Sequence, residues 1–266
     1  MSKWLIVGSG GFIAPRHFES IKNIGDEVVG TCDVKSDTNP DFTDYKEMLE
    51  LVSADAVAIC TPNYLHYPMI QMALDKGLRV LCEKPLTLSS KEIEQLPNDG
   101  RVGAVLQLRY HPVCYLRPMK KLEGGSIILK VYRDDDYWAS WKGSKEKSGG
   151  ILFNLGVHYF DLLIYLLGNE YKIIESSYSD RLAKGKIDFN GSVFDYYIEI
   201  MDNNDGQDRR LTISGQEISL SKQDNLSYEG WHTDVYRDFK GGKVVTPFEA
   251  CKSIKLIEKC IHTQQQ

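Results

Sequence analysis

The sequence predicts an α/β fold in which a doubly wound parallel sheet is followed by a second domain with a large, mostly antiparallel sheet. The first 112 residues alternate short β-rich apolar runs with amphipathic stretches, the pattern of a parallel sheet with helices on both faces. A glycine-rich turn directly follows the first of these runs. Beyond residue 112, strand-like runs follow one another with turns between them, as in antiparallel sheets. We therefore predict a nucleotide-binding Rossmann domain at residues 1–112 and an α+β substrate-binding domain at residues 113–266.

In the first domain each strand is a short apolar run, and the helices are amphipathic segments bounded by capping residues or glycine. The expected strands are residues 3–7, 27–32, 56–60, 78–82 and 101–108. The expected helices are residues 15–24, 44–52, 67–76 and a short one from Ser89 or Ser90 to residue 96. Gly25 and Gly77 end two of these helices.

The second domain is predicted from longer β-rich runs at residues 126–133, 171–179, 186–201 and 209–221. One long helix interrupts them at residues 151–167, between the pair Gly149 and Gly150 and the terminating Gly168. Two further helices are expected near residues 233–240 and 247–262.

Composition excludes several classes of protein. Of the 266 residues 42% are hydrophobic and 26% charged, and the net charge of -5 argues against nucleic acid as a partner. No apolar run approaches the roughly 18 to 20 residues that span a membrane, and the apolar residues 4–7 are too short for a signal peptide. The six cysteines form no C-x-x-C pair, so we expect free thiols, no metal site and a cytoplasmic protein.

The turn after the first strand contains Gly8, Gly10 and Gly11 and opens the first helix. Backbone N–H groups and the positive end of a helix dipole can meet a pyrophosphate there, provided that no Cβ blocks the approach. The usual fingerprint has a third small residue five positions after the first, where this chain has Ile13. A plain tight turn is the alternative.

Asp33 ends the second strand, 23 residues after Gly10. An aspartate in this place accepts the adenosine ribose hydroxyls and repels a 2′-phosphate, which favours NAD over NADP. The alternative is a solvated aspartate at the end of a strand.

Two loops follow the third and fourth strands, at the carboxyl edge where doubly wound sheets bind ligands. The second loop is Glu83-Lys84-Pro85. The polar and conformationally restricted residues of the first loop are Thr61, Pro62, Asn63 and His66. We expect both loops to surround the nicotinamide.

These motifs, together with Gly149-Gly150 and the spacing Asn154-x-x-x-His158-x-x-Asp161, resemble the glucose–fructose oxidoreductase/inositol dehydrogenase family of NAD(P)-dependent sugar dehydrogenases over essentially the whole chain. Three segments resemble one branch of it, the nucleotide-sugar 3-dehydrogenases that act on UDP-N-acetylglucosaminuronic acid in O-antigen sugar pathways. They are residues 11–17, residues 106–112 and Trp141-Lys142-Gly143.

The helix at residues 151–167 carries a polar stripe. Asn154, His158, Asp161 and Tyr165 stand at i, i+4, i+7 and i+11, and such a stripe is unfavourable to bury unless it meets a ligand or polar partners. The alternative is a histidine that hydrogen bonds in a seam between domains.

The resemblance implies oxidation of a ring hydroxyl at C3, with Lys84, His158 and Asp161 as the catalytic residues. We favour His158 as general base, because an imidazole titrates near neutral pH, with Lys84 donating to the developing alkoxide and Asp161 positioning one of them. The reverse assignment is chemically legitimate, since the positive charge of oxidised nicotinamide lowers the pKa of a nearby lysine.

The remaining site residues are predicted as contacts. Further cofactor contacts are Phe12, Ile13, Glu83, Gln107 and Arg109. The expected substrate contacts are Arg16, Lys84, Trp141, Lys142, Asn154 and His158.

Two other functions remain open: a dehydrogenase of a free sugar or inositol, and a non-catalytic NAD-binding regulator. A broad sheet with one uncovered face suggests a homo-oligomer, a dimer or tetramer.

Overall fold

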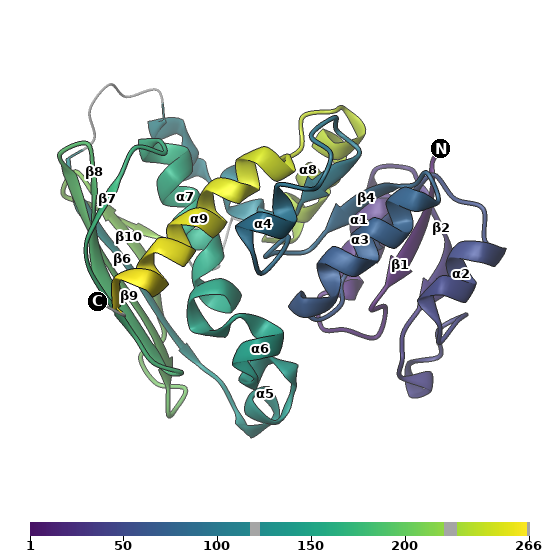
Figure 1. The fold of residues 1–266 in the computed structure, drawn as a ribbon, viewed down its shortest axis with the longest axis horizontal. Coiled ribbons are helices and arrows are strands. Elements are labelled where there is room, and N and C mark those ends of the chain that lie inside the picture. Colours follow the sequence, from purple (N-terminus) through teal and green to yellow (C-terminus); the bar gives the residue numbers. More distant parts are fainter. Residues whose placement is uncertain (118–122, 221–227, 265–266) are drawn as a thin grey trace. The chain divides into compact units, whose positions relative to one another are not determined.

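The computed structural model describes residues 1–117, 123–220 and 228–264 and divides the chain into two compact units (Figure 1). Unit 1 contains Met1–Gln107 and Tyr228–Cys251. Unit 2 contains Leu108–Ser227 and Lys252–Gln266.

Unit 1 is built on a five-stranded parallel sheet of order β2-β1-β3-β4-β5, which confirms the predicted doubly wound domain. Its strands are β1 Lys3–Val7, β2 Glu27–Cys32, β3 Ala56–Ile59, β4 Arg79–Cys82 and β5 Val102–Ala104. Its first helices are α1 Ala14–Asn23, α2 Tyr45–Leu51, α3 His66–Asp75 and α4 Ser90–Ile93. The last expected strand, residues 101–108, is too long, because the chain leaves the sheet after Ala104 and forms a 3₁₀ turn at Gln107–Tyr110.

Local sequence explains these elements. All four residues of β3 are buried, as in a strand that is covered on both faces. Asp44 caps α2 by accepting a hydrogen bond from the Glu47 N–H, and Ser89 caps α4 in the same way through Lys91.

The helix α8, Tyr228–Lys240, belongs to unit 1 although the sequence places its residues in the second domain. Lys240 Nζ lies 2.7 Å from Asp26 Oδ1, and the Trp4 indole N–H donates to the other oxygen of Asp26 at 3.2 Å. The ring of Trp4 also packs against Tyr236 and Phe239. A single boundary at residue 112 cannot describe a segment that returns to the first unit.

Unit 2 contains a six-stranded sheet of order β11-β10-β6-β9-β8-β7. Only the pair β6 and β9 is parallel among these neighbours, which confirms the predicted mostly antiparallel sheet. The strands are β6 Gly125–Tyr132, β7 Lys172–Tyr178, β8 Leu182–Phe189, β9 Ser192–Met201, β10 Asp208–Ile213 and β11 Gln216–Ser219.

Two expected strands of this sheet are hairpins. The run at residues 186–201 is broken at Asn190 and Gly191, which have φ values of 53° and 90°. This Asn-Gly pair forms a tight turn that requires positive φ at both positions. Ser214 and Gly215 divide the run at 209–221 in the same manner, and its last residue, Ser221, lies outside the described residues.

The long helix of unit 2 is not a uniform α-helix. Residues Leu152–Gly156 form a π-helical turn that leads into α7, Val157–Leu167. The short helices α5 Asp135–Ala139 and α6 Lys145–Ser148 precede it, and α9, Pro247–Gln264, ends the described chain.

Contrary to the sequence-based expectation, the stretch Lys145–Leu167 is long and apolar enough to cross a membrane by length and composition. However, 72% of its apolar window is buried inside the protein. Such burial is typical of the core helix of a water-soluble domain.

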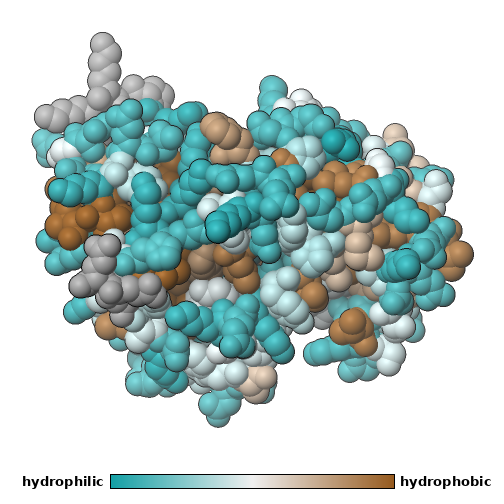
Figure 2. Space-filling view, viewed as in Figure 1, coloured by the Kyte–Doolittle hydropathy of each residue, from teal (hydrophilic) through white to brown (hydrophobic). Residues whose placement is uncertain are grey.

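All six cysteines are free thiols, as expected, and five of them are buried. In the view of Figure 2 most of the surface is hydrophilic, and hydrophobic residues appear in separate groups.

Candidate active site

The glycine turn joins β1 to α1, as the sequence predicts. Gly8 has φ +80°, and a Cβ there would lie 2.7 Å from the Cys60 carbonyl group. A Cβ on Gly10 would lie 2.4 Å from the γ-methyl of Thr38. No side chain caps α1. The Ala14 and Arg16 N–H groups donate to the carbonyls of Gly11 and Ile13, and Pro15 has no N–H, so the N–H groups just before the helix, at Phe12 and Ile13, are the ones that can meet phosphate oxygens. The turn therefore fits the pyrophosphate of a dinucleotide.

Asp33 braces this turn. Its Oδ2 accepts the Gly10 N–H at 2.9 Å, and its Oδ1 accepts the Lys35 N–H at 2.9 Å. Each carboxylate oxygen can accept about two hydrogen bonds, so capacity remains for ribose hydroxyls. Asp33 thus fits a role in both loop geometry and ribose binding.

We expect Asp33→Ser to weaken NAD binding and to narrow its advantage over NADP, because the variant loses the carboxylate that accepts the hydroxyls and repels a 2′-phosphate. Calorimetric titration of the variant with NAD and with NADP measures the two affinities. Asp37→Ser, which removes an exposed carboxylate from the same segment, serves as the control. Equal losses in both variants, or none in either, would remove Asp33 from the cofactor site.

The loop after β3 is tied to the loop after β4 by His66. Nδ1 of His66 lies 2.7 Å from the Pro85 carbonyl oxygen, and Nε2 lies 2.9 Å from that of Thr61. Burial lowers the pKa of His66, so at neutral pH it donates to one of these carbonyls. These contacts give His66 a bracing role, and its contact with cofactor stays a prediction, as do those of Thr61, Pro62 and Asn63.

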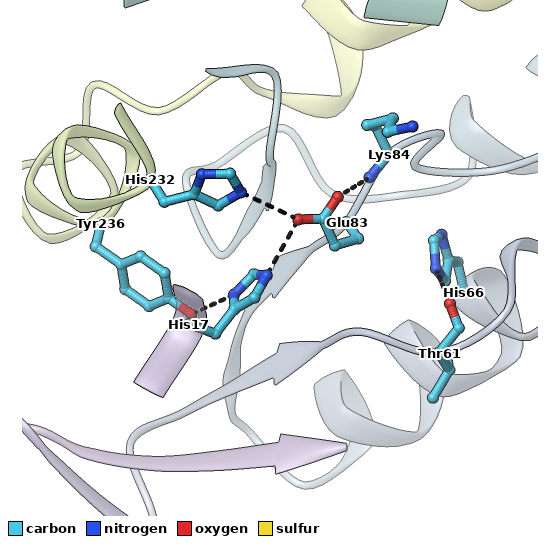
Figure 3. Close-up of polar contacts among 7 residues, drawn as sticks. All are labelled: His17, Thr61, His66, Glu83, Lys84, His232 and Tyr236. Carbon is cyan, nitrogen blue, oxygen red and sulfur yellow. Dashed lines mark hydrogen bonds and ion pairs between the residues drawn. The ribbon is translucent and has the colours of Figure 1, made fainter. Parts of the chain in front are cut away.

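Glu83 lies at the centre of a buried polar cluster, which we call the Glu83 cluster: His17, Glu83, His232 and Tyr236 (Figure 3). Oε1 of Glu83 is 3.1 Å from His17 Nε2 and 3.6 Å from His232 Nε2. The other ring nitrogen of His17 lies 2.7 Å from the Tyr236 hydroxyl. Oε2 of Glu83 accepts the Lys84 backbone N–H at 3.2 Å.

The protonation states of this cluster follow from burial and pairing. Burial lowers the pKa of His17, against the raising effect of Glu83. Burial alone would raise the pKa of Glu83, but the hydrogen bonds and charges of His17 and His232 hold that pKa well below its ordinary value. An ionised carboxylate therefore stands directly before Lys84.

Lys84 follows β4 at the carboxyl edge of the sheet and is half-buried. Figure 3 shows its amine directed away from the Glu83 carboxylate. Glu83 therefore fixes the backbone of Lys84 and leaves the amine outside the Glu83 cluster. The predicted cofactor contact of Glu83 stays a prediction.

In unit 2, Asp161 is paired with Arg109. Arg109 donates from Nε to Oδ2 at 2.9 Å and from a terminal nitrogen to Oδ1 at 2.8 Å. Both side chains are largely buried, and such a bidentate pair fixes both groups. The expected cofactor residue Arg109 thus holds Asp161, and the predicted positioning role of Asp161 and the cofactor contact of Arg109 stay predictions.

The polar stripe begins in the π-helical turn. Asn154 is buried, and its amide donates to the Tyr137 hydroxyl at 2.8 Å, whereas His158 lies half-buried in the first turn of α7. The π turn changes the spacing that a regular α-helix would give between these two residues. π turns recur at functional sites, which agrees with the role assigned to this stripe.

The other predicted residues are divided between the units. Arg16 and Gln107 belong to unit 1, with Gln107 buried and Arg16 half-buried. Trp141 and Lys142 lie in a 3₁₀ turn of unit 2. Their substrate or cofactor contacts stay predictions.

The sequence analysis did not place His232 or Tyr236 in the site. The two residues are one helical turn apart on α8, a spacing that places them on one face. They lie 149 residues or more beyond Glu83, so only the fold shows which carboxylate that face meets.

Comparison with known proteins agrees with this architecture. Residues 2–98 match the model of an oxidoreductase family with an NAD-binding Rossmann fold, and residues 99–229 match the C-terminal alpha/beta domain of the same family. The chain belongs to the glucose–fructose oxidoreductase/inositol dehydrogenase/MocA (Gfo/Idh/MocA) family. Its first domain is therefore an NAD-binding Rossmann domain.

Among solved structures, the WlbA (WbpB) dehydrogenase from Thermus thermophilus in complex with NAD and UDP-GlcNAcA is 28% identical, with a TM-score of 0.83. The alignment covers 97% of this chain and 94% of that one.

Two curated relatives match shorter segments. The scyllo-inositol 2-dehydrogenase (NAD(+)) of Bacillus subtilis is 33% identical over 131 residues, which are 47% of this chain and 38% of that protein. The 2,7-anhydro-N-acetylneuraminate hydratase of Mediterraneibacter gnavus is 29% identical over 162 residues, which are 56% of this chain and 41% of that protein. The matched segments thus span less than half of each relative.

Proposed function

We propose that this Gfo/Idh/MocA family member is an NAD-dependent dehydrogenase that oxidises the C3 hydroxyl of a UDP-linked amino sugar, UDP-N-acetylglucosaminuronic acid. One observation carries the proposal. Over 97% of its length the chain is similar to a dehydrogenase whose structure holds NAD and UDP-GlcNAcA. In unit 1 the glycine turn is shaped to hold the pyrophosphate of NAD, and Asp33 can accept hydrogen bonds from its ribose hydroxyls.

The proposed chemistry assigns separate tasks to the chain's side chains. NAD, when bound, supplies the acceptor for a hydride from the substrate carbon. His158 removes the hydroxyl proton, and Lys84 donates a hydrogen bond to the oxygen on which negative charge develops. Asp161 positions one of these two residues, His158 or Lys84. The reverse assignment, with Lys84 as base, uses the same two residues.

We further propose that unit 1, which includes α8, binds the cofactor and that unit 2 binds most of the substrate. These are the roles predicted for the domains at residues 1–112 and 113–266. A homo-oligomer, a dimer or tetramer, in the cytoplasm completes the proposal. Ile174 of β7 and Val193 of β9, two exposed apolar side chains of the sheet in unit 2, support it, because exposed apolar groups favour association.

Oxidation of a free sugar or of inositol is the second candidate, and the similarity to an inositol dehydrogenase favours it. A non-catalytic NAD-binding regulator is the third, and the presence of both Lys84 and His158 argues against it.

The test is a parallel assay of NADH formation with UDP-N-acetylglucosaminuronate, UDP-N-acetylglucosamine, glucose and myo-inositol. We expect the first to be turned over with the highest kcat/KM. We also expect Lys142→Ala to raise its KM, because a cation close to an anionic substrate is lost. Turnover confined to glucose or inositol would establish the second candidate, and no NADH with any of the four would contradict the dehydrogenase.

A further inference from the structure

A group of three basic side chains, the Arg133 cluster, lies at one end of the sheet of unit 2. It consists of Arg133, Lys142 and Arg209, of which only Lys142 is among the substrate contacts expected from sequence. All three residues are half-buried. Among the residues that the structure describes, no carboxylate forms an ion pair with any of them, although Asp134 is close enough to act on Arg133 and Lys142.

The strand register places the two arginines on one face. Leu129 and Val131 of β6 are buried, and Arg133 continues their alternation one step beyond the strand. Arg209 of β10 stands opposite Leu129 in the antiparallel pair, so its side chain shares that face. Both guanidinium groups therefore continue the apolar rows that form the core face of this sheet.

Tyr137 links this cluster to the polar stripe of the helix. Two cations lie beside its ring, with Arg133 Cζ 5.5 Å and Lys142 Nζ 6.0 Å from the ring centre. Its hydroxyl accepts the amide hydrogen bond from Asn154, four residues before His158. Tyr137 is 8% exposed, so its buried side chain forms a rigid support between the basic group and the stripe.

The electrostatic situation favours an anion. Burial lowers the pKa of Arg133, and the charge of Arg209 lowers it further, against raising contributions from Tyr137, Tyr159 and Asp134. Burial likewise lowers the pKa of Lys142, and Arg133 adds to that effect. Half-buried like charges repel one another in a medium of low polarity, and an anion placed among them relieves that repulsion.

We propose that Arg133, Lys142 and Arg209 form an anion-binding site that holds an anionic oxygen group of the substrate, either the sugar carboxylate or the diphosphate. This inference rests on the proposed function for the identity of the ligand, but the site itself is defined by unit 2 alone. Arg133 is the central residue, since a guanidinium can bind either group with two parallel hydrogen bonds.

The test is calorimetric titration of the NAD-loaded full-length protein with UDP-N-acetylglucosaminuronate, UDP-N-acetylglucosamine and UDP. We expect Arg133→Gln and Arg209→Gln to weaken binding of the first ligand by about tenfold or more, the loss expected for a charge-assisted contact. Arg133→Lys, which keeps the charge but not the planar fork, should give an intermediate loss.

Arg210→Gln is the matched control. Arg210 follows Arg209 on the same strand, points to the opposite face and is paired with Asp208 and Glu217. Its replacement removes the same charge and should leave the three affinities unchanged. An unchanged melting temperature in Arg133→Gln or Arg133→Lys shows that the variant is folded.

The ligands separate the two anionic groups. If the cluster binds the carboxylate, Arg133→Gln weakens only UDP-N-acetylglucosaminuronate; if it binds the diphosphate, all three ligands weaken alike. Wild-type affinity in folded Arg133 and Arg209 variants, or a wild type that binds none of the three ligands, overturns the site. If binding depends on Arg133 but none of the sugars gives NADH, the anion-binding site is supported and the proposed dehydrogenase activity is contradicted.

Discussion

Replacing Lys84 with methionine is expected to lower turnover by about a hundredfold or more, the range found when an acid–base group is removed. Methionine keeps the length and flexibility of the side chain and removes only the amine. The backbone N–H through which Glu83 holds this residue is retained. NAD affinity and the melting temperature should therefore stay close to wild type.

His158→Gln should give a loss of similar size for the same reason. If the two residues act on one proton transfer, the double variant should lose little more than either single variant, because groups that act as a unit are strongly non-additive. Steady-state NADH assays give the four rates, and Lys76→Met, an exposed lysine of unit 1, is the control. Near-normal turnover in both single variants would mean that neither residue takes part in proton transfer.

Glu83→Ala is expected to lower the free energy of unfolding by about 1.5 to 3 kcal/mol, the range for losing a buried hydrogen bond to a charged group. The Glu83 carboxylate is the acceptor for His17 and for the Lys84 backbone and lies near His232. Its loss leaves two fully buried imidazoles without their carboxylate. Urea unfolding of Glu83→Ala, compared with Glu50→Ala on the exposed side of α2, measures the effect.

The pH dependence of stability gives a second measure of the Glu83 cluster. The pKa of His17 is lower in the folded state than its ordinary 6.5, so the unfolded state binds the proton more readily and stability falls as pH drops below about 6.5. The pKa of Glu83 is also lowered from 4.5, which adds a further loss below about 4.5. Glu83→Gln should remove the second loss. Two results together would contradict the buried pairing of Glu83. One is that Glu83→Gln loses stability at acidic pH in the same way as wild type, and the other is that Glu83→Ala changes the free energy of unfolding by less than about 0.5 kcal/mol.

Much of the fold follows from local sequence. The strands of the first domain are continuous apolar runs, and glycine or a capping residue marks most helix ends. The two hairpins of unit 2 were recognisable in principle, because Asn190-Gly191 and Ser214-Gly215 have the composition of tight turns. The long β-rich runs around them outweighed that local signal.

The parts of the site that the sequence could not supply depend on contacts between distant segments. The residues next to Glu83 in the sequence do not indicate its partners from α8. The imidazole of His232 lies beside Glu83, and the phenol of Tyr236 contacts His17. Arg109 and Asp161 were both recognised, but their mutual pairing was not. The π turn before α7 also lay beyond prediction, since it changes the register of a helix whose residues read as regular.

The most direct test of the dehydrogenase proposal follows the transferred hydrogen. UDP-N-acetylglucosaminuronate that carries deuterium at C3 is incubated with the protein and NAD, and the reduced cofactor is analysed by mass spectrometry. We expect the deuterium to appear in the NADH and the sugar product to be the 3-keto compound. NADH without deuterium, or deuterium retained at C3 while another position is oxidised, would contradict it.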